Sequence, residues 1–234
     1  QGQAQERGLL SALFPGMVEE TRGNIDLDLK AQGTWAQPDF QGSLRMSNAG
    51  ASIPSLGILA EDLSSRLRFR NEQIQVESLR VRSGPGYLEG TGTIWLKNWG
   101  MERFEGNLKG EKFQTFYLPS MRMQSSPRLQ FQGTPSHLAV RGEILLPEVH
   151  IYDVSAPGVT KTSSDIVMVD EPTAGESRFT MDIQVRLILG DQIQVKAGAI
   201  DARLAGNLDL KILGLTPEEM TARGEVRLTQ GFYS

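Results

Sequence analysis

The feature that most constrains this chain is a long alternation of apolar and polar side chains between residues 179 and 228. From Phe179 to Leu189 an apolar residue occupies every second position, and the pattern resumes at Ile193 after an expected turn at Gly190–Asp191. A repeat of two is typical of a β-strand with one solvated face. Such a strand spans roughly 36 Å, whereas common strands reach about 17–20 Å. A sheet this wide must cover its apolar face with itself, another sheet or an apolar ligand.

The same alternation recurs along most of the chain, and glycine punctuates it. A glycine precedes an alternating stretch at Gly23, Gly42, Gly106, Gly142, Gly206 and Gly224. Glycine in such a position supplies a turn with positive φ or lets neighbouring backbones approach closely. Repetition of one small unit indicates an elongated architecture. We therefore predict a single all-β domain over residues 23–234.

Two segments depart from this pattern. In the leading segment, residues 1–22, a narrow apolar stripe predicts a short helix followed by a linker, with a frayed terminal turn as the alternative. That stripe consists of Leu9, Leu10, Leu13 and Phe14. Residues 111–126 contain aromatics, a proline and methionines without clear alternation, so we expect a helix or loop insert there.

The apolar positions change parity within one predicted strand. Ile74 and Val76 are apolar, but the next apolar pair is Leu79 and Val81. A slip of one residue would send the second pair to the opposite face of the sheet. We therefore predict a β-bulge at Glu77–Ser78 that returns both pairs to one face.

Composition excludes several classes of function. The chain has 234 residues, a net charge of −4 and no cysteine. Its cations are interleaved with acids, which argues against nucleic-acid binding because that requires a basic face. Without cysteine, neither disulfides nor thiol chemistry is possible. No apolar run approaches the ~20 residues of a membrane-spanning helix. Residues 1–7 lack a signal-peptide pattern, so we expect a cytosolic chain or a segment of a longer protein.

The polar residues form no pattern typical of catalysis or metal binding. His137 and His150 are the only histidines, and they fit ordinary strand residues better than a metal pair. The Asp26–Asp28 pair falls on the exposed side of a strand, where carboxylates are normally solvated. Glycines at 84–86 and 90–92 lack the following helix that would bind a phosphate, so turns and close packing explain them better. We expect no enzyme activity, no metal and no cofactor.

The apolar face of the predicted sheet is the remaining feature that can indicate a function. From periodicity alone, the ordinary interpretation is the core of a closed sandwich or barrel. A membrane barrel fits poorly, because aromatic residues make up only 7% of the chain and form no interfacial girdles.

Short motifs, in a fixed order, resemble those of the TamB family of Gram-negative envelope proteins and its AsmA-like relatives. They are GTWAQPDFQGSL at 33–44, LLPEVHI at 145–151, SSDIVMVD at 163–170, GDQIQV at 190–195, GNL at 206–208 and GEVRLTQGFY at 224–233. Val149 departs from the alanine that the family often has at that position. The family's sequence normally continues past Tyr233, and its inner-membrane anchor lies outside this chain. The resemblance therefore implies a periplasmic fragment of a protein anchored in the inner membrane.

The resemblance implies a β-taco, an elongated half-pipe sheet whose concave side is an apolar groove. It implies phospholipid as the cargo, moved between the inner and outer membranes, and a TamA-like outer-membrane barrel as partner. The residues expected to face inward are mainly aliphatic. Such a surface suits the binding of acyl chains, since each methylene that is buried contributes about 0.8 kcal/mol. The alternatives are a scaffold for assembly of outer-membrane barrels, which needs a free edge strand, and a simple spacer.

The predicted lipid-binding groove consists of the apolar residues that alternate inward. They are Ile25, Leu27, Leu29, Leu44, Met46, Leu67, Phe69, Ile74, Val76, Leu79, Val81, Ile94, Leu96, Met181, Ile183, Val185, Leu187, Ile193, Val195, Leu204, Leu208, Leu210, Val226 and Leu228.

Overall fold

Strands make up nearly all of the protein that can be described. The computed structural model describes residues 2–5, 16–34, 37–98, 100–152, 179–197, 200–214 and 219–233. The strands are β1 (Gly2–Gln5), β2 (Glu19–Thr34), β3 (Gln37–Ile53), β4 (Ile58–Asn71), β5 (Gln73–Ser83), β6 (Gly86–Lys97), β7 (Gly100–Glu111), β8 (Phe113–Leu118), β9 (Met121–Thr134), β10 (His137–Ile151), β11 (Thr180–Ala197), β12 (Ile200–Ile212) and β13 (Met220–Tyr233). None of the described residues forms an apolar helix of membrane-spanning length.

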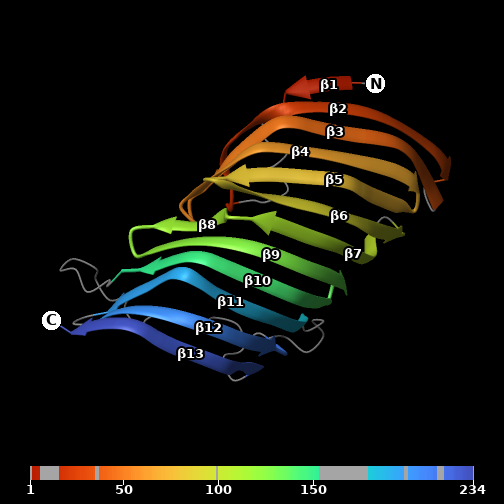
Figure 1. Ribbon diagram of the computed structural model, residues 1–234. Helices are drawn as coiled ribbons and strands as arrows, with labels where there is room; N and C mark the ends of the chain where they lie inside the picture. Colours follow the sequence, from red (N-terminus) through yellow and green to blue (C-terminus); the bar gives the residue numbers. More distant parts are fainter. Residues whose placement is uncertain are drawn as a thin grey trace, which may run out of the picture.

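All of these strands belong to one sheet. Its order is β1 to β7 and then β9 to β13, so neighbours in the sequence are mostly neighbours in space (Figure 1). Every adjacent pair is antiparallel except β10 and β11, which run parallel. Strand β8 lies off this path, since β7 pairs with one half of β9 and β8 with the other half. The all-β class and the elongated, unclosed sheet agree with the sequence-based prediction.

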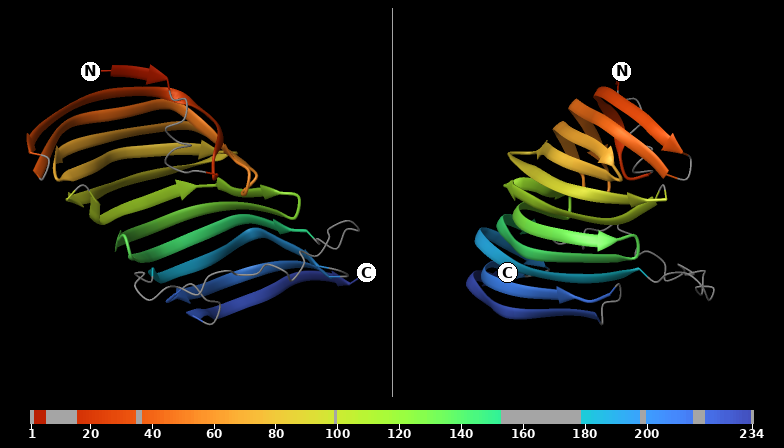
Figure 2. Two further views of the ribbon diagram at one scale, coloured as in Figure 1. Left: turned by 180° about the vertical axis from the view of Figure 1, so that it is seen from behind. Right: turned by 90° about the vertical axis from the view of Figure 1, so that its right-hand side faces the viewer.

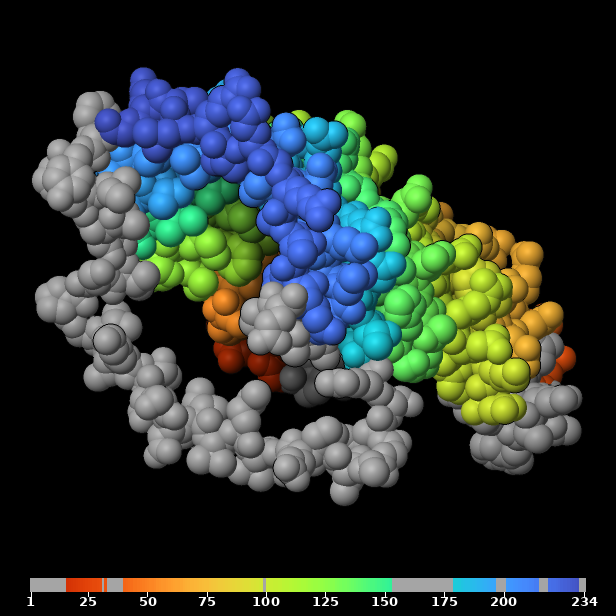
Figure 3. Space-filling view, turned by 90° about the horizontal axis from the view of Figure 1, so that it is seen from below, coloured from red at the N-terminus to blue at the C-terminus, as the bar shows by residue number. Residues whose placement is uncertain are grey.

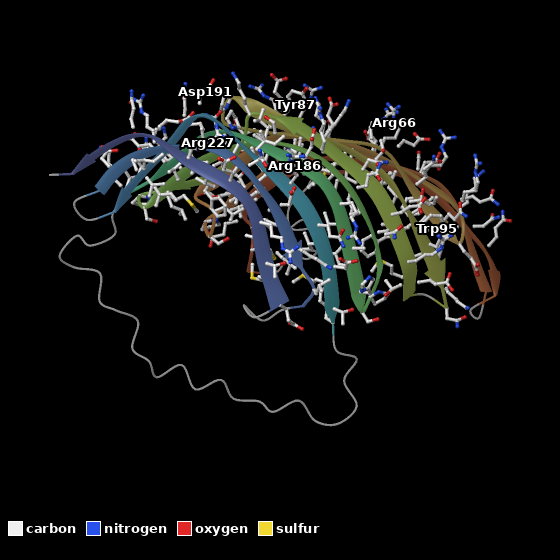
Figure 4. The ribbon with its side chains drawn as sticks, turned by 60° about the horizontal axis from the view of Figure 1, so that its bottom comes forward. Arg66, Tyr87, Trp95, Arg186, Asp191 and Arg227 are labelled. Carbon is white, nitrogen blue, oxygen red and sulfur yellow. The ribbon has the colours of Figure 1, made fainter. Side chains whose placement is uncertain are left out.

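The sheet curls about the axis along which its strands are stacked. The long strands are drawn as arcs in Figure 2, so the sheet has a concave and a convex side. Seen along the stack from the β13 end, the concave side is hollowed (Figure 3). Arg66, Arg186 and Arg227 lie on the convex side (Figure 4). Because side chains alternate between faces along a strand, the apolar residues between the polar ones face the concave side.

The bulge predicted from the change of parity in β5 is confirmed. The register of β5 shifts between Val76 and Leu79 relative to β6, and a matching shift occurs against β4. Two residues, Glu77 and Ser78, therefore oppose a single residue of β6. The extra residue returns Leu79 and Val81 to the same face as Val76.

The recurring glycines lie within strands rather than in turns. Gly42 of β3 and Gly142 of β10 have φ angles of 150° and 141°, a region that other residues rarely adopt. A Cβ atom on Gly42 would overlap the carbonyl oxygen of Asp28, and one on Gly142 would overlap that of Arg128. Both glycines therefore have a positive φ angle and also let the neighbouring backbone approach closely. Glycine kinks of this kind introduce curvature into a sheet.

Two clusters of buried apolar residues lie on the concave side. Met46, Ala49 and Ala51 of β3 form one. The other contains Leu146, Val149 and Ile193, from β10 and β11. Register shifts accompany both clusters, and a bulge bends its strand. These side chains therefore pack together where the strands are bulged.

Four expectations from the sequence differ from the structure or lie outside it. The predicted turn at Gly190–Asp191 is wrong, because β11 runs through it with a register shift. The helix or loop expected at 111–126 is instead the end of β7, all of β8 and the start of β9. The helix stripe at 9–14 lies outside the described residues. The expected leading linker is shorter than 1–22, since Gly2–Gln5 forms β1 and β2 begins at Glu19.

Candidate ligand-binding face

Two rows of paired residues cross the concave face without a break from β2 to β13. The first is Leu27, Leu44, Leu67, Val76, Gly92, Gly106, Phe131, Val140, Ile183, Ile212 and Met220. The second is Ile25, Met46, Ser65, Leu79, Gly90, Leu108, Leu129, Gly142, Val185, Leu210 and Ala222. Neither row contains a charged residue, and the only hydroxyl in them is that of Ser65. An uncharged strip therefore crosses the sheet from β2 to β13.

The register brings every residue of the predicted groove set onto this face. Leu29 is in a third row with Phe69, Ile74 and Ile94. The remaining predicted residues lie an even number of positions from a row residue on the same strand, or pair directly with inward residues of the next strand. Those pairs include Leu187 with Leu208 and Leu204 with Leu228.

Several inward residues were missed by the prediction, most of them on the central strands. Phe104, Leu108, Leu129, Phe131 and Val140 occupy the same rows as the predicted residues. Leu129, Phe131 and Val140 alternate visibly in the sequence, so the signal was present. Glycines beside Leu108 and Phe104 obscured the pattern on β7, because a glycine has no side chain to mark a face.

Burial is uneven along the face. Ile193 is 3% exposed, and Val185 and Met46 are also buried. At the two ends of the sheet the inward side chains are open, with Leu27 39% and Leu228 63% exposed. Between these extremes most inward side chains are half-buried. Apart from the two packed clusters, the concave face is therefore a partly solvated apolar surface rather than a filled core.

The convex face carries the charges, and many of them are paired across strands. Examples are Arg68 with Glu77 at 2.6 Å and Arg80 with Glu89 at 2.5 Å. Exposed pairs of this kind contribute little stability, about 0–1 kcal/mol each. They do keep the polar side of the sheet well solvated and distinct from the apolar side. Within the described residues, no three His, Asp or Glu side chains gather as metal ligands would.

One ion pair marks the parallel junction between β10 and β11. Arg141 donates hydrogen bonds to the backbone oxygen and to a carboxylate oxygen of Asp182, at 2.7 and 2.5 Å. This charge-assisted contact lowers the pKa of the Asp182 carboxyl below its ordinary value. Arg141 also donates to the carbonyl of Val140, so one side chain ties together both strands of the junction.

Comparison with known protein families identifies the chain. The family model for the TamB C-terminal domain matches residues 75–234, more than half of its length. The chain belongs to the TamB family. No solved structure matches it. The match supports the resemblance read from the short sequence motifs, and it begins within β5.

Membership in the TamB family sets the biological context. TamB proteins belong to the envelope of Gram-negative bacteria and work with TamA in the translocation and assembly module. The family is one of transport and assembly rather than of known enzymes. In this TamB domain the apolar rows continue from the matched strands through β4 and β3 to β2. The concave face is thus continuous across the boundary of the matched region.

Proposed function

We propose that this TamB domain holds phospholipid acyl chains along its concave face while lipid moves between the inner and outer membranes. The observation that carries the proposal is the pair of uncharged rows crossing the sheet from β2 to β13. Acyl chains need an aliphatic and unspecific surface, whereas a small-molecule pocket normally includes a few precisely placed polar groups. In the full-length protein, this segment would lie in the periplasm between an inner-membrane anchor and a TamA-like barrel.

The partial solvation of the face agrees with a surface that binds and releases. Burying each methylene of an acyl chain contributes about 0.8 kcal/mol, so a few contacts per strand suffice for holding without trapping. The absence of inward charges in the two rows leaves the phosphate group outside them, because an unpaired charge in hydrocarbon is strongly unfavourable.

Assembly of outer-membrane barrels is a second candidate function. It is favoured by β13, which pairs with β12 alone among the strands of the described residues and whose residues at 220–231 are exposed in this segment. An edge strand of this kind can pair with a strand of a client protein through backbone hydrogen bonds. This function requires the edge and not the continuous apolar face.

Photo-crosslinking separates the two functions. A crosslinking amino acid at Ile183 should label phospholipid in the full-length protein, whereas one at the outward, exposed Gln184 should not. Lipid labelling at both positions, or at neither, would contradict the proposal. Barrel precursors captured only from β13, with no lipid captured from the concave face, would favour the scaffold function instead.

Charge insertion provides an independent test on another strand. Val76→Asp places a carboxylate in the first uncharged row, and Gln75→Asp places the same group on the exposed face of the same strand. We expect the first change to reduce lipid labelling at Ile183 by more than about tenfold, because about 1.4 kcal/mol already corresponds to that factor. The second change should leave labelling unaltered. Equal labelling in the two variants would argue against an acyl-chain conduit.

A further inference from the structure

The convex face carries a cluster of arginines on β3 and β4. Three successive outward positions of β4 are arginine, namely Arg66, Arg68 and Arg70. On β3, Arg45 lies directly opposite Arg66 in the register. All four residues are exposed, and Arg66 lies on the convex side in Figure 4. These four residues are called the arginine patch below.

Most of the patch is not neutralised by carboxylates of the same chain. Just beyond it, Arg82 forms an ion pair with Asp62 at 3.1 Å. Inside the patch, Arg68 has an equivalent partner, Glu77 on β5, at 2.6 Å. Among the described residues, the other three arginines of the patch form neither an ion pair nor a side-chain hydrogen bond. Three cations are therefore available to an anion from outside the chain.

The pairing of Arg45 with Arg66 does not stabilise the sheet by itself. Like charges directly opposite each other on two strands are destabilising. Asp26 lies opposite Arg45 on β2, but in the described part of the chain no ion pair joins the two side chains. An anion bound between the two guanidinium groups would remove their repulsion and accept hydrogen bonds from both. A ligand with negative charge therefore accounts for this juxtaposition.

We propose that the arginine patch docks an extended acidic segment of a partner protein. Alternate residues of a strand lie roughly 6.6 Å apart. An extended segment with an acidic residue at every second position therefore presents its carboxylates at the spacing of Arg66, Arg68 and Arg70. Arginine suits this role because its planar group binds a carboxylate through two parallel hydrogen bonds. The proposal does not depend on acyl-chain binding, since the patch lies on the opposite face of the sheet.

A membrane surface fits the patch less well than an acidic segment does. The outward neighbours of the arginines on β3, β4 and β5 include Ser43, Ser64 and Gln75. None of the described outward residues beside the patch on these strands is aromatic or aliphatic, so none can anchor in the membrane interface. Hydrogen bonds from arginine to carboxylates need no such anchor.

The test measures binding of a short fluorescent peptide, in which serine alternates with glutamate, to the purified chain by fluorescence anisotropy. A matched peptide has glutamine in place of each glutamate. Wild type should bind the acidic peptide in preference to the matched one, and added salt should weaken this binding. Arg66→Gln should weaken it at least about tenfold, as expected for the loss of a charge-assisted hydrogen bond. Arg66→Lys, which keeps the charge but not the planar group, should cause a smaller loss.

Arg82→Gln is the matched control, because it removes another exposed arginine that Asp62 already neutralises, and it should change the affinity less than about twofold. Arg66→Gln should not lower the melting temperature, since it relieves the repulsion with Arg45; a lower value would indicate a structural role instead. Equal losses in the Arg66 and Arg82 variants, equal binding of the two peptides, or no binding of the acidic peptide would overturn the proposal. Binding of phosphatidylglycerol vesicles through Arg66, without binding of the peptide, would also overturn it and assign the patch to a membrane surface.

Discussion

Truncation of Ile193 tests whether the concave face is packed in one place and open in another. Ile193 is 3% exposed and belongs to the cluster with Leu146 and Val149, against which Leu204 also packs. Leu228 faces the same side but is 63% exposed. The same change to alanine at Ile193 and Leu228 should therefore have very different effects on the free energy of unfolding.

The magnitude follows from the burial. Ile193→Ala removes three carbon atoms, each worth about 0.8 kcal/mol when buried, and leaves a cavity that the cluster can only partly close. We expect a loss of about 3 kcal/mol, within the range of about 2–5 measured for such substitutions. For a domain of this size, that loss lowers the melting temperature by roughly 6–12 °C. Leu228→Ala should cost about 0.5 kcal/mol, as for most surface substitutions.

Urea denaturation followed by far-ultraviolet circular dichroism measures both variants, with thermal melting as a second readout. A uniform cost at the two positions would refute the reasoning, because it would mean that inward residues are equally covered along the whole face. A small cost at Ile193 with a large cost at Leu228 would contradict the burial of the packed cluster.

Two further predictions concern the backbone and the parallel junction. Gly42→Ala should destabilise the domain by at least about 1–3 kcal/mol in urea denaturation, because alanine at a φ of 150° is strained and its Cβ overlaps a carbonyl oxygen. Gly100→Ala, where the nearest atom would be 3.6 Å away, should be nearly neutral. Arg141 lowers the pKa of Asp182, so this carboxylate contributes stability above its unfolded pKa, near 3.9, and loses it as pH falls through the lower folded value. Stability of Asp182→Asn should therefore depend less steeply on pH below about 4 than that of the wild type, and an unchanged slope would contradict the assignment.

Local patterns in the sequence were sufficient to predict the faces of the sheet. The alternation from Met181 to Leu189 marks strand β11, and its inward residues are all found on the concave side. The parity change between Val76 and Leu79 even predicted a bulge, because only an extra residue lets one strand keep both pairs inside. Such inferences succeed because each depends on the chemistry of adjacent residues.

Features that depend on distant segments were not predictable in this way. Nothing near Gly190 indicates that β11 continues, because the continuation is set by pairing with β10 on one side and β12 on the other. Strand β8 contains Thr115, whose hydroxyl pairs with that of Ser125 on β9, and its backbone reaches the β3–β4 turn through Tyr117 and Leu56. Contacts across this distance in sequence leave no local periodicity.

The continuity of the two apolar rows links the part of the chain matched by the family model to the part before it. A slip of one residue at any of the pairings from β2 to β13 would turn all later side chains of a row to the convex side. The register contains several bulges, including one in β5 and others near the packed clusters, yet both rows remain inward throughout. A spacer would need only a stable sheet and would tolerate a charged residue or a change of face part-way. An acyl-chain conduit would fail at the first such position, so preserved parity across every bulge is the feature that best distinguishes the two.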